Sequence, residues 1–129
     1  MKNLRWIILL FYVAAAYDGI LSAAFLFIPS SIFSWFNVSP PNHPGYIQFP
    51  AALLIVFAVM FLNIARTPIH NRNLILYGIL LKVSYCSVAF WHWFSGALPT
   101  MWKPFAVFDV IFGLLFMWAN ISLKNEQSS

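Results

Sequence analysis

Long apolar segments alternate with short polar breaks along the chain, and this alternation is the main structural signal in the sequence. Apolar segments at residues 6–28, 49–65, 73–94 and 104–123 approach or exceed the roughly 20 helical residues that cross a bilayer core. Helices are expected because lipid offers the backbone no hydrogen-bond partners, and so few spans cannot close a β-barrel. The sequence therefore predicts an all-α integral membrane four-helix bundle, a single domain over residues 1–129 with a polar tail at 124–129.

Breaks rich in proline, glycine and other turn-forming residues separate the apolar segments, at 39–45, 66–68 and 95–99. The second segment is the shortest. A start near Tyr46 is an alternative for it, because proline is tolerated in a first helical turn and Pro50 would lie close to that turn.

The first apolar segment shares features with a secretory signal, since Lys2 and Arg5 precede it and residues 14–16 are all alanine. Its apolar run continues past Asp18 to Ile28, a length appropriate for a membrane span. The segment is therefore predicted to be the first transmembrane helix.

The basic residues outside the spans predict the orientation. One side of the membrane would carry Lys2, Arg5, Arg66, Arg72 and Lys124, and the other would carry Lys103. Cytoplasmic segments hold the excess of Lys and Arg, so both termini and the middle connection are predicted to be cytoplasmic. The predicted location is the bacterial cytoplasmic (inner) membrane, with most tryptophans near its outer boundary.

The first outer connection contains a short stretch, residues 30–36, with two interpretations. Ile32, Phe33 and Phe36 would fall on one side of a short helix, which would then lie flat in the membrane interface. The other interpretation is an irregular loop.

Composition limits the function classes. The chain is 62% hydrophobic and 8% charged, outside the range of soluble domains. Its net charge of +4 does not indicate nucleic-acid binding, because the basic residues lie at helix ends. A single cysteine, Cys86, excludes an intrachain disulfide and a cysteine-rich metal site. Phosphate-binding loops and hydrolase motifs are absent from the sequence, so an ordinary enzyme is not predicted, and neither is a metal or cofactor site.

Three ionisable residues lie inside predicted spans: Asp18 in the first, Lys82 in the third and Asp109 in the fourth. On insertion scales, a charged residue at a span centre costs about 2.5 to 3.5 kcal/mol, which favours pairing. At about 1.5 Å per helical residue, all three lie roughly 14 to 20 Å from the cytoplasmic boundary. Their matched depth predicts a buried Asp18–Lys82–Asp109 centre.

This centre has two interpretations. It is either a salt-bridge cluster that fixes helix order, or a site that binds a ligand or relays protons. Its two carboxylates outnumber its one ammonium, so it would either attract a cation or hold a proton. His92, near the outer end of the third span, is either an interfacial histidine or the entrance of a proton path to Asp109.

The layout resembles that of small four-span bacterial membrane proteins in the DoxX-like families. The segments behind this resemblance are Tyr17-Asp18-Gly19, Ile28-Pro29, Ala65-Arg66-Thr67-Pro68, Asn71-Arg72, Gly78-Ile79-Leu80-Leu81-Lys82 and Asp109. The resemblance implies a protein without an assigned activity or an accessory subunit, in some members of a quinone-linked respiratory enzyme.

The leading hypothesis is a non-enzymatic membrane protein whose Asp18–Lys82–Asp109 centre binds a small ligand or supports a larger complex. The first alternative is a dimeric, proton-coupled transporter of small molecules. The second is a redox accessory protein holding quinone or haem, the latter through His43 and His92. Membrane lipid is the expected partner, together with a second copy of the chain or a larger membrane complex.

Overall fold

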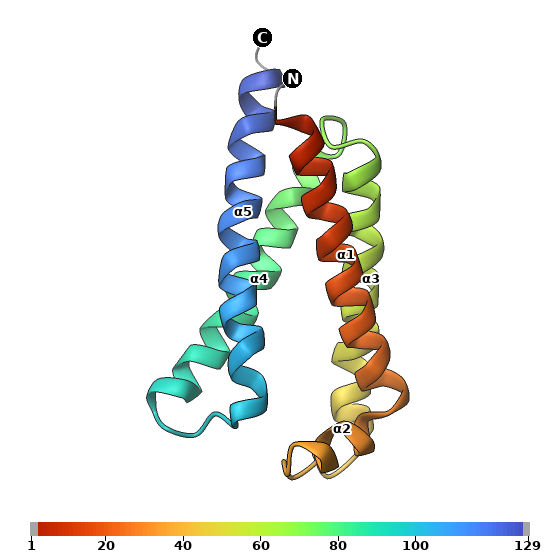
Figure 1. The fold of residues 1–129 in the computed structure, drawn as a ribbon, viewed down its shortest axis with the longest axis vertical. Helices are drawn as coiled ribbons and strands as arrows, with labels where there is room; N and C mark the ends of the chain where they lie inside the picture. Colours follow the sequence, from red (N-terminus) through yellow and green to blue (C-terminus); the bar gives the residue numbers. More distant parts are fainter. Residues whose placement is uncertain (1–2, 128–129) are drawn as a thin grey trace.

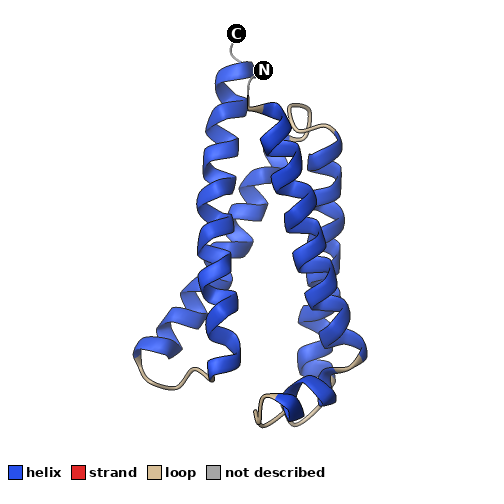
Figure 2. Ribbon diagram, in the orientation of Figure 1, coloured by secondary structure: helices blue, strands red, loops and turns tan. Residues whose placement is uncertain are grey.

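The computed structural model of the protein describes residues 3–127, and the side chains of residues 3–125. All regular structure in that range is helical (Figure 2). The elements are α1 (Leu4–Phe27), α2 (Pro29–Trp35), α3 (Gly45–Arg66), α4 (Arg72–Phe94), η1 (Thr100–Trp102) and α5 (Lys103–Gln127). Four of these helices are long and apolar enough to cross a membrane, which confirms the predicted all-α fold with four candidate spans. Lys2 and residues 128–129 of the polar tail lie outside the described residues.

The long helices form two antiparallel pairs, α1 with α3 and α4 with α5 (Figure 1). The N-terminus, the C-terminus and the α3–α4 turn lie at one end of the molecule, called here the terminal end. Helix α2 and the α4–α5 connection lie at the opposite, distal end. The two pairs approach one another at the terminal end and diverge toward the distal end (Figure 1).

Residues in the left-handed conformation follow two of the helices, and one of them, Gly96, lies in a predicted break. Asn37 after α2 and Gly96 after α4 adopt the left-handed conformation, with φ of 55° and 82°. Beyond α4, the N–H of Ala97 donates to the carbonyl of His92 at 2.8 Å and the N–H of Gly96 donates to the carbonyl of Trp93 at 3.1 Å, which are the two bonds of a Schellman motif. Glycine and asparagine reach this conformation most readily, which explains their position at these helix ends.

Two helices are longer than the apolar segments that predicted them. Helix α3 begins at Gly45, one residue before the alternative start at Tyr46, and therefore includes Pro50 in its second turn. Helix α5 continues through residues 124–127 of the polar tail.

Residues 30–36 are helical except for Phe36, so the irregular-loop interpretation is wrong. Ile32 and Phe33 are buried in a cluster with Phe25 of α1, whereas Phe36 is exposed. Phe36 follows the last helical residue, Trp35, and the expectation that the helix lies flat in the membrane interface stays a prediction.

Two apolar clusters hold the bundle. The terminal cluster joins all four long helices, and rings from three of them, Phe11, Phe61 and Phe116, meet with centroid separations of 4.8 to 6.1 Å. The distal cluster joins α1, α2 and α3 to Met101 of η1. The ionisable residues of the spans lie between these two clusters.

Candidate functional site

Helices α1, α4 and α5 bring Asp18, Lys82 and Asp109 together in the middle of the bundle. The side chains are nearly inaccessible, since the residues are 1%, 2% and 8% exposed. The Nζ of Lys82 donates to both carboxylate oxygens of Asp18, at 3.1 and 3.0 Å, and to Oδ1 of Asp109 at 3.1 Å. The predicted buried salt-bridge centre is confirmed, and its three side chains are in direct contact.

The hydrogen bonds of Lys82 leave the centre with an excess of acceptors. An ammonium group has three N–H donors and no acceptor, and the three carboxylate oxygens around Lys82 match those donors. Among the side chains that the structure describes, Oδ2 of Asp109 has no hydrogen-bond partner. With all three groups ionised, the centre carries one net negative charge.

Aromatic rings surround the same ammonium. Its Nζ lies 5.8 Å from the ring centroid of Tyr17, 5.9 Å from that of Phe61 and 5.4 Å from that of Phe112. These separations lie within the range of cation–π attraction. Phe61 also belongs to the terminal cluster, so packed rings close the terminal side of the centre.

Glycines allow the helices to approach around Lys82. A Cβ at Gly78 would lie 2.8 Å from Cε1 of Phe61, closer than side chains pack. A Cβ at Gly113 of α5 would lie 3.5 Å from Cβ of Lys82, an ordinary contact. Gly78 is therefore the position where only glycine lets the Phe61 ring pack against α4.

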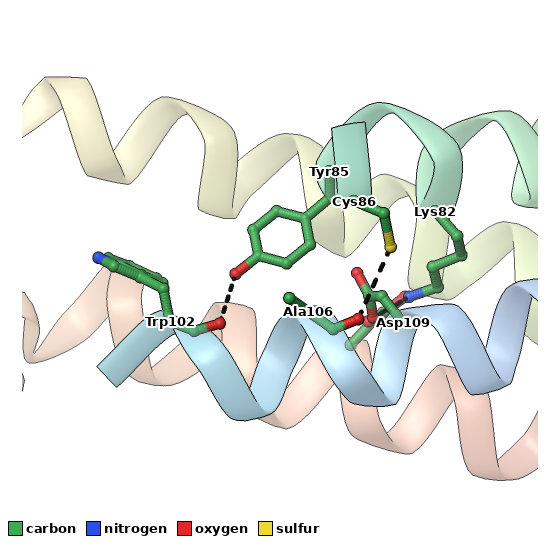
Figure 3. A network of polar contacts seen from close by, with 7 residues as sticks. Lys82, Tyr85, Cys86, Trp102, Ala106 and Asp109 are labelled. Atoms are coloured by element: carbon green, nitrogen blue, oxygen red, sulfur yellow. Dashed lines mark hydrogen bonds and ion pairs between the residues drawn. The ribbon is translucent and has the colours of Figure 1, made fainter. Parts of the chain in front are cut away.

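Polar contacts between α4 and α5 hold Lys82 opposite Asp109 (Figure 3). The hydroxyl of Tyr85 donates to the carbonyl of Trp102 at 3.2 Å, and Sγ of Cys86 lies 3.7 Å from the carbonyl of Ala106. Tyr85 and Cys86 follow Lys82 by three and four residues, so they share its helix face. Their bonds tie the distal part of α4 to η1 and to the first turn of α5.

A cavity of about 470 Å³ lies on the distal side of the centre, and Asp18 and Asp109 are among its lining residues. Its volume falls within the range of roughly 300 to 1,000 Å³ that is typical of small-molecule sites. Most of its wall is apolar or aromatic, and it includes Leu21, Phe25, Ile47, Pro50, Ala51, Leu53, Leu54, Phe57, Leu81, Val88, Ala89, Leu98, Trp102 and Phe105. The cavity thus has charged groups at one end and apolar walls elsewhere.

The cavity opens between α3 and α4. Leu53 of α3 and Val88 of α4 line it and are 47% and 61% exposed. On the α1–α5 side, Phe25 is buried and stacks on Trp102 with centroids 5.3 Å apart. Access to the charged centre is therefore lateral, from the face of the bundle where α3 and α4 diverge.

His92 lines the same cavity as Asp109 but is exposed. No hydrogen bond or ion pair joins these two residues in the part of the chain that the structure describes. A relay from His92 to Asp109 therefore stays a prediction. His43, the other outer histidine, accepts a hydrogen bond from the backbone N–H of Gly45 at 3.0 Å. Within residues 3–127, no group of three or more His, Cys, Asp or Glu residues could hold a metal ion.

The wall that α3 contributes was not anticipated from the sequence. This helix carries no acidic or basic residue until Arg66 at its end, so no charge marked it as part of a site. Small residues were the available signal, because Ala51 lines the cavity and is buried.

Comparison of the chain with protein-family models, with curated proteins and with solved structures gives no match in any of the three. The resemblance to the DoxX-like families stays a prediction from the sequence, and the function is argued from the geometry of the site.

Proposed function

We propose that the protein is a multipass protein of the bacterial inner membrane, with both termini cytoplasmic, that binds a small amphipathic ligand from the membrane. The polar group of the ligand lies at the Asp18–Lys82–Asp109 centre, and its apolar part fills the distal cavity. The observation that carries this proposal is one cavity of about 470 Å³ whose lining combines apolar walls with two nearly buried carboxylates.

The extent of the lining supports an elongated ligand. On α1 the lining runs from Asp18 to Phe25, a distance of seven residues or about 10 Å along the helix. A ligand with its head at the centre therefore has a mostly apolar wall of about that length for its tail.

Two features favour binding over the alternatives. A salt-bridge cluster that only fixes helix order needs no cavity beside it. Transport requires access from both sides, whereas the rings of Phe11, Phe61 and Phe116 close the terminal side of the centre. The proton-coupled transporter remains the alternative and requires a second conformation in which these rings separate. The DoxX-like layout supports a binding or accessory role within a larger membrane complex.

Blocking the cavity mouth tests the binding proposal. Val88→Trp places an indole at the opening, whereas Val83→Trp places one on an exposed position of the same helix that does not line the cavity. Wild-type protein and both variants are purified in mild detergent, and small molecules extracted from each are quantified by mass spectrometry. We expect an amphipathic molecule to copurify with the wild type and with Val83→Trp and to be depleted at least about tenfold in Val88→Trp. Equal amounts in both variants, or none in the wild type, would contradict the proposal.

Cysteine labelling tests the orientation. In a Cys86→Ser background, Asn42→Cys places a thiol in the α2–α3 connection and His70→Cys places one in the α3–α4 turn, both at exposed positions. A membrane-impermeant maleimide applied to intact spheroplasts is expected to label Asn42→Cys and to label His70→Cys only after lysis. The reverse pattern would show that the termini are periplasmic.

A further inference from the structure

We infer that the cavity selects amphipathic cations bearing N–H donors, such as a primary alkylamine, and discriminates against amphipathic anions and against ligands with only acceptor groups. This inference rests on the proposed ligand-binding function and specifies the chemistry of its ligand.

The first argument is the charge of the centre. Two carboxylates and one ammonium are nearly buried together, and the second carboxylate, Asp109, lines the cavity. A cationic head group there would make the centre and its ligand neutral as a whole. An anionic head group would raise the net negative charge in a poorly solvated place, where like charges repel strongly.

The second argument is the supply of donors and acceptors at the charged end. All three donors of Lys82 are directed to Asp18 and Asp109. Two further donors that line the cavity are also engaged, since Ser22 donates to the carbonyl of Asp18 and Tyr85 donates to the carbonyl of Trp102.

One acceptor at the charged end of the cavity is free, although the donors there are engaged. Oδ2 of Asp109 has no partner among the described side chains and can accept from a ligand. The other donors of the lining, on His92 and Trp102, belong to the distal part of the cavity. The hydroxyl of Tyr17, unpaired within the described part of the chain, is buried beside Lys82 but does not belong to the cavity lining. A carboxylate or a quinone carbonyl at the charged end of the cavity would therefore find no free donor among the lining residues there, and desolvating it would not be compensated.

The third argument concerns the path. The mouth between α3 and α4 is lined by exposed apolar side chains, including Leu53 and Val88. Aromatic residues Phe57 and Phe105 line the interior and suit a cationic head because ring faces attract cations. An alkylamine in the bilayer could enter head first through this mouth and reach Asp109.

A matched ligand series tests the inference. Decylamine, decanol and decanoate share one chain length and differ in the head group, which is a cation, a neutral hydroxyl or an anion near neutral pH. Binding of each to the purified wild-type protein is measured by native mass spectrometry from micelles at several concentrations. We expect decylamine to bind at least about tenfold more tightly than decanoate, because only the ammonium can donate a charge-assisted hydrogen bond to Asp109.

A variant of Asp109 tests whether this residue causes the preference for decylamine. Asp109→Asn keeps the size of the side chain and removes its charge, and we expect it to reduce the preference for decylamine by about tenfold. Ser84→Ala, which removes an exposed hydroxyl bonded to the carbonyl of Leu80 on α4, is the control and should leave the preference unchanged.

The outcomes separate the two proposals. If decanoate binds as tightly as decylamine, or more tightly, the cation inference is overturned while ligand binding stands. If no decyl compound binds, and no molecule copurifies with the wild type, the proposed function itself fails. A preference for decylamine that Asp109→Asn leaves intact also overturns the inference, since the selecting group would lie elsewhere. Should Asp109→Asn fail to fold, the wild-type ligand series alone decides.

Discussion

Replacing Lys82 with methionine is predicted to destabilise the protein more than removing all three charges of the centre. Methionine is unbranched and similar in length, so it preserves most of the packing of the lysine stem. The ammonium is lost, and with it the three hydrogen bonds of 3.0 to 3.1 Å to Asp18 and Asp109. Both carboxylates are then left together without a cation, at 1% and 8% exposure.

The magnitude follows from that burial. Breaking a buried ion pair by removing one partner costs about 3 to 5 kcal/mol, whereas replacing the whole set with neutral residues is often nearly neutral. The Lys82→Met variant should therefore lose about 3 to 5 kcal/mol of unfolding free energy. The unfolding free energy of the triple variant Asp18→Asn/Lys82→Met/Asp109→Asn should exceed that of Lys82→Met by at least about 2 kcal/mol.

Unfolding free energies can be measured by titration with dodecyl sulfate in mixed micelles, followed by far-ultraviolet circular dichroism. Lys103→Met is the matched control, because the ammonium of Lys103 makes one cation–π contact, 5.3 Å from the ring centroid of Trp93. Its loss should cost about 1 kcal/mol or less. A Lys82→Met variant as stable as Lys103→Met, or a triple variant less stable than Lys82→Met, would refute the reasoning.

Backbone positions give further predictions in the same assay. Gly78→Ala should cost about 1 to 3 kcal/mol, because its Cβ would lie 2.8 Å from Phe61. Gly19→Ala is the matched helical control. Its Cβ would lie an ordinary 3.8 Å from the nearest side chain, so it should be neutral or stabilising, and equal losses for both glycines would contradict the packing argument. Gly96→Ala should cost about 1 to 2 kcal/mol, because alanine is strained at φ of 82° although no atom lies within 4 Å; an unchanged stability would show that this helix end can rearrange.

The amino-acid sequence alone was sufficient to predict the four long helices and the heights of the three charged residues along them. Long apolar runs determine helices of membrane-spanning length, because a backbone without water must satisfy its hydrogen bonds internally. A constant rise per residue then places Asp18, Lys82 and Asp109 at similar heights without knowledge of the packing. The break at Ser95-Gly96 was predictable for a local reason, since glycine readily adopts the left-handed backbone conformation found there.

Tertiary structure alone decided which helices pair and what lies beside the charges. Height along a helix says nothing about rotation around its axis, so contact between Lys82 and both carboxylates required the packed bundle. The cavity depends on the divergence of the two helix pairs and on a wall from α3, whose apolar residues look alike in sequence whether they face lipid, core or cavity. Local hydrophobicity determines that such residues leave water, and the crossing of the helices determines which of them enclose a space.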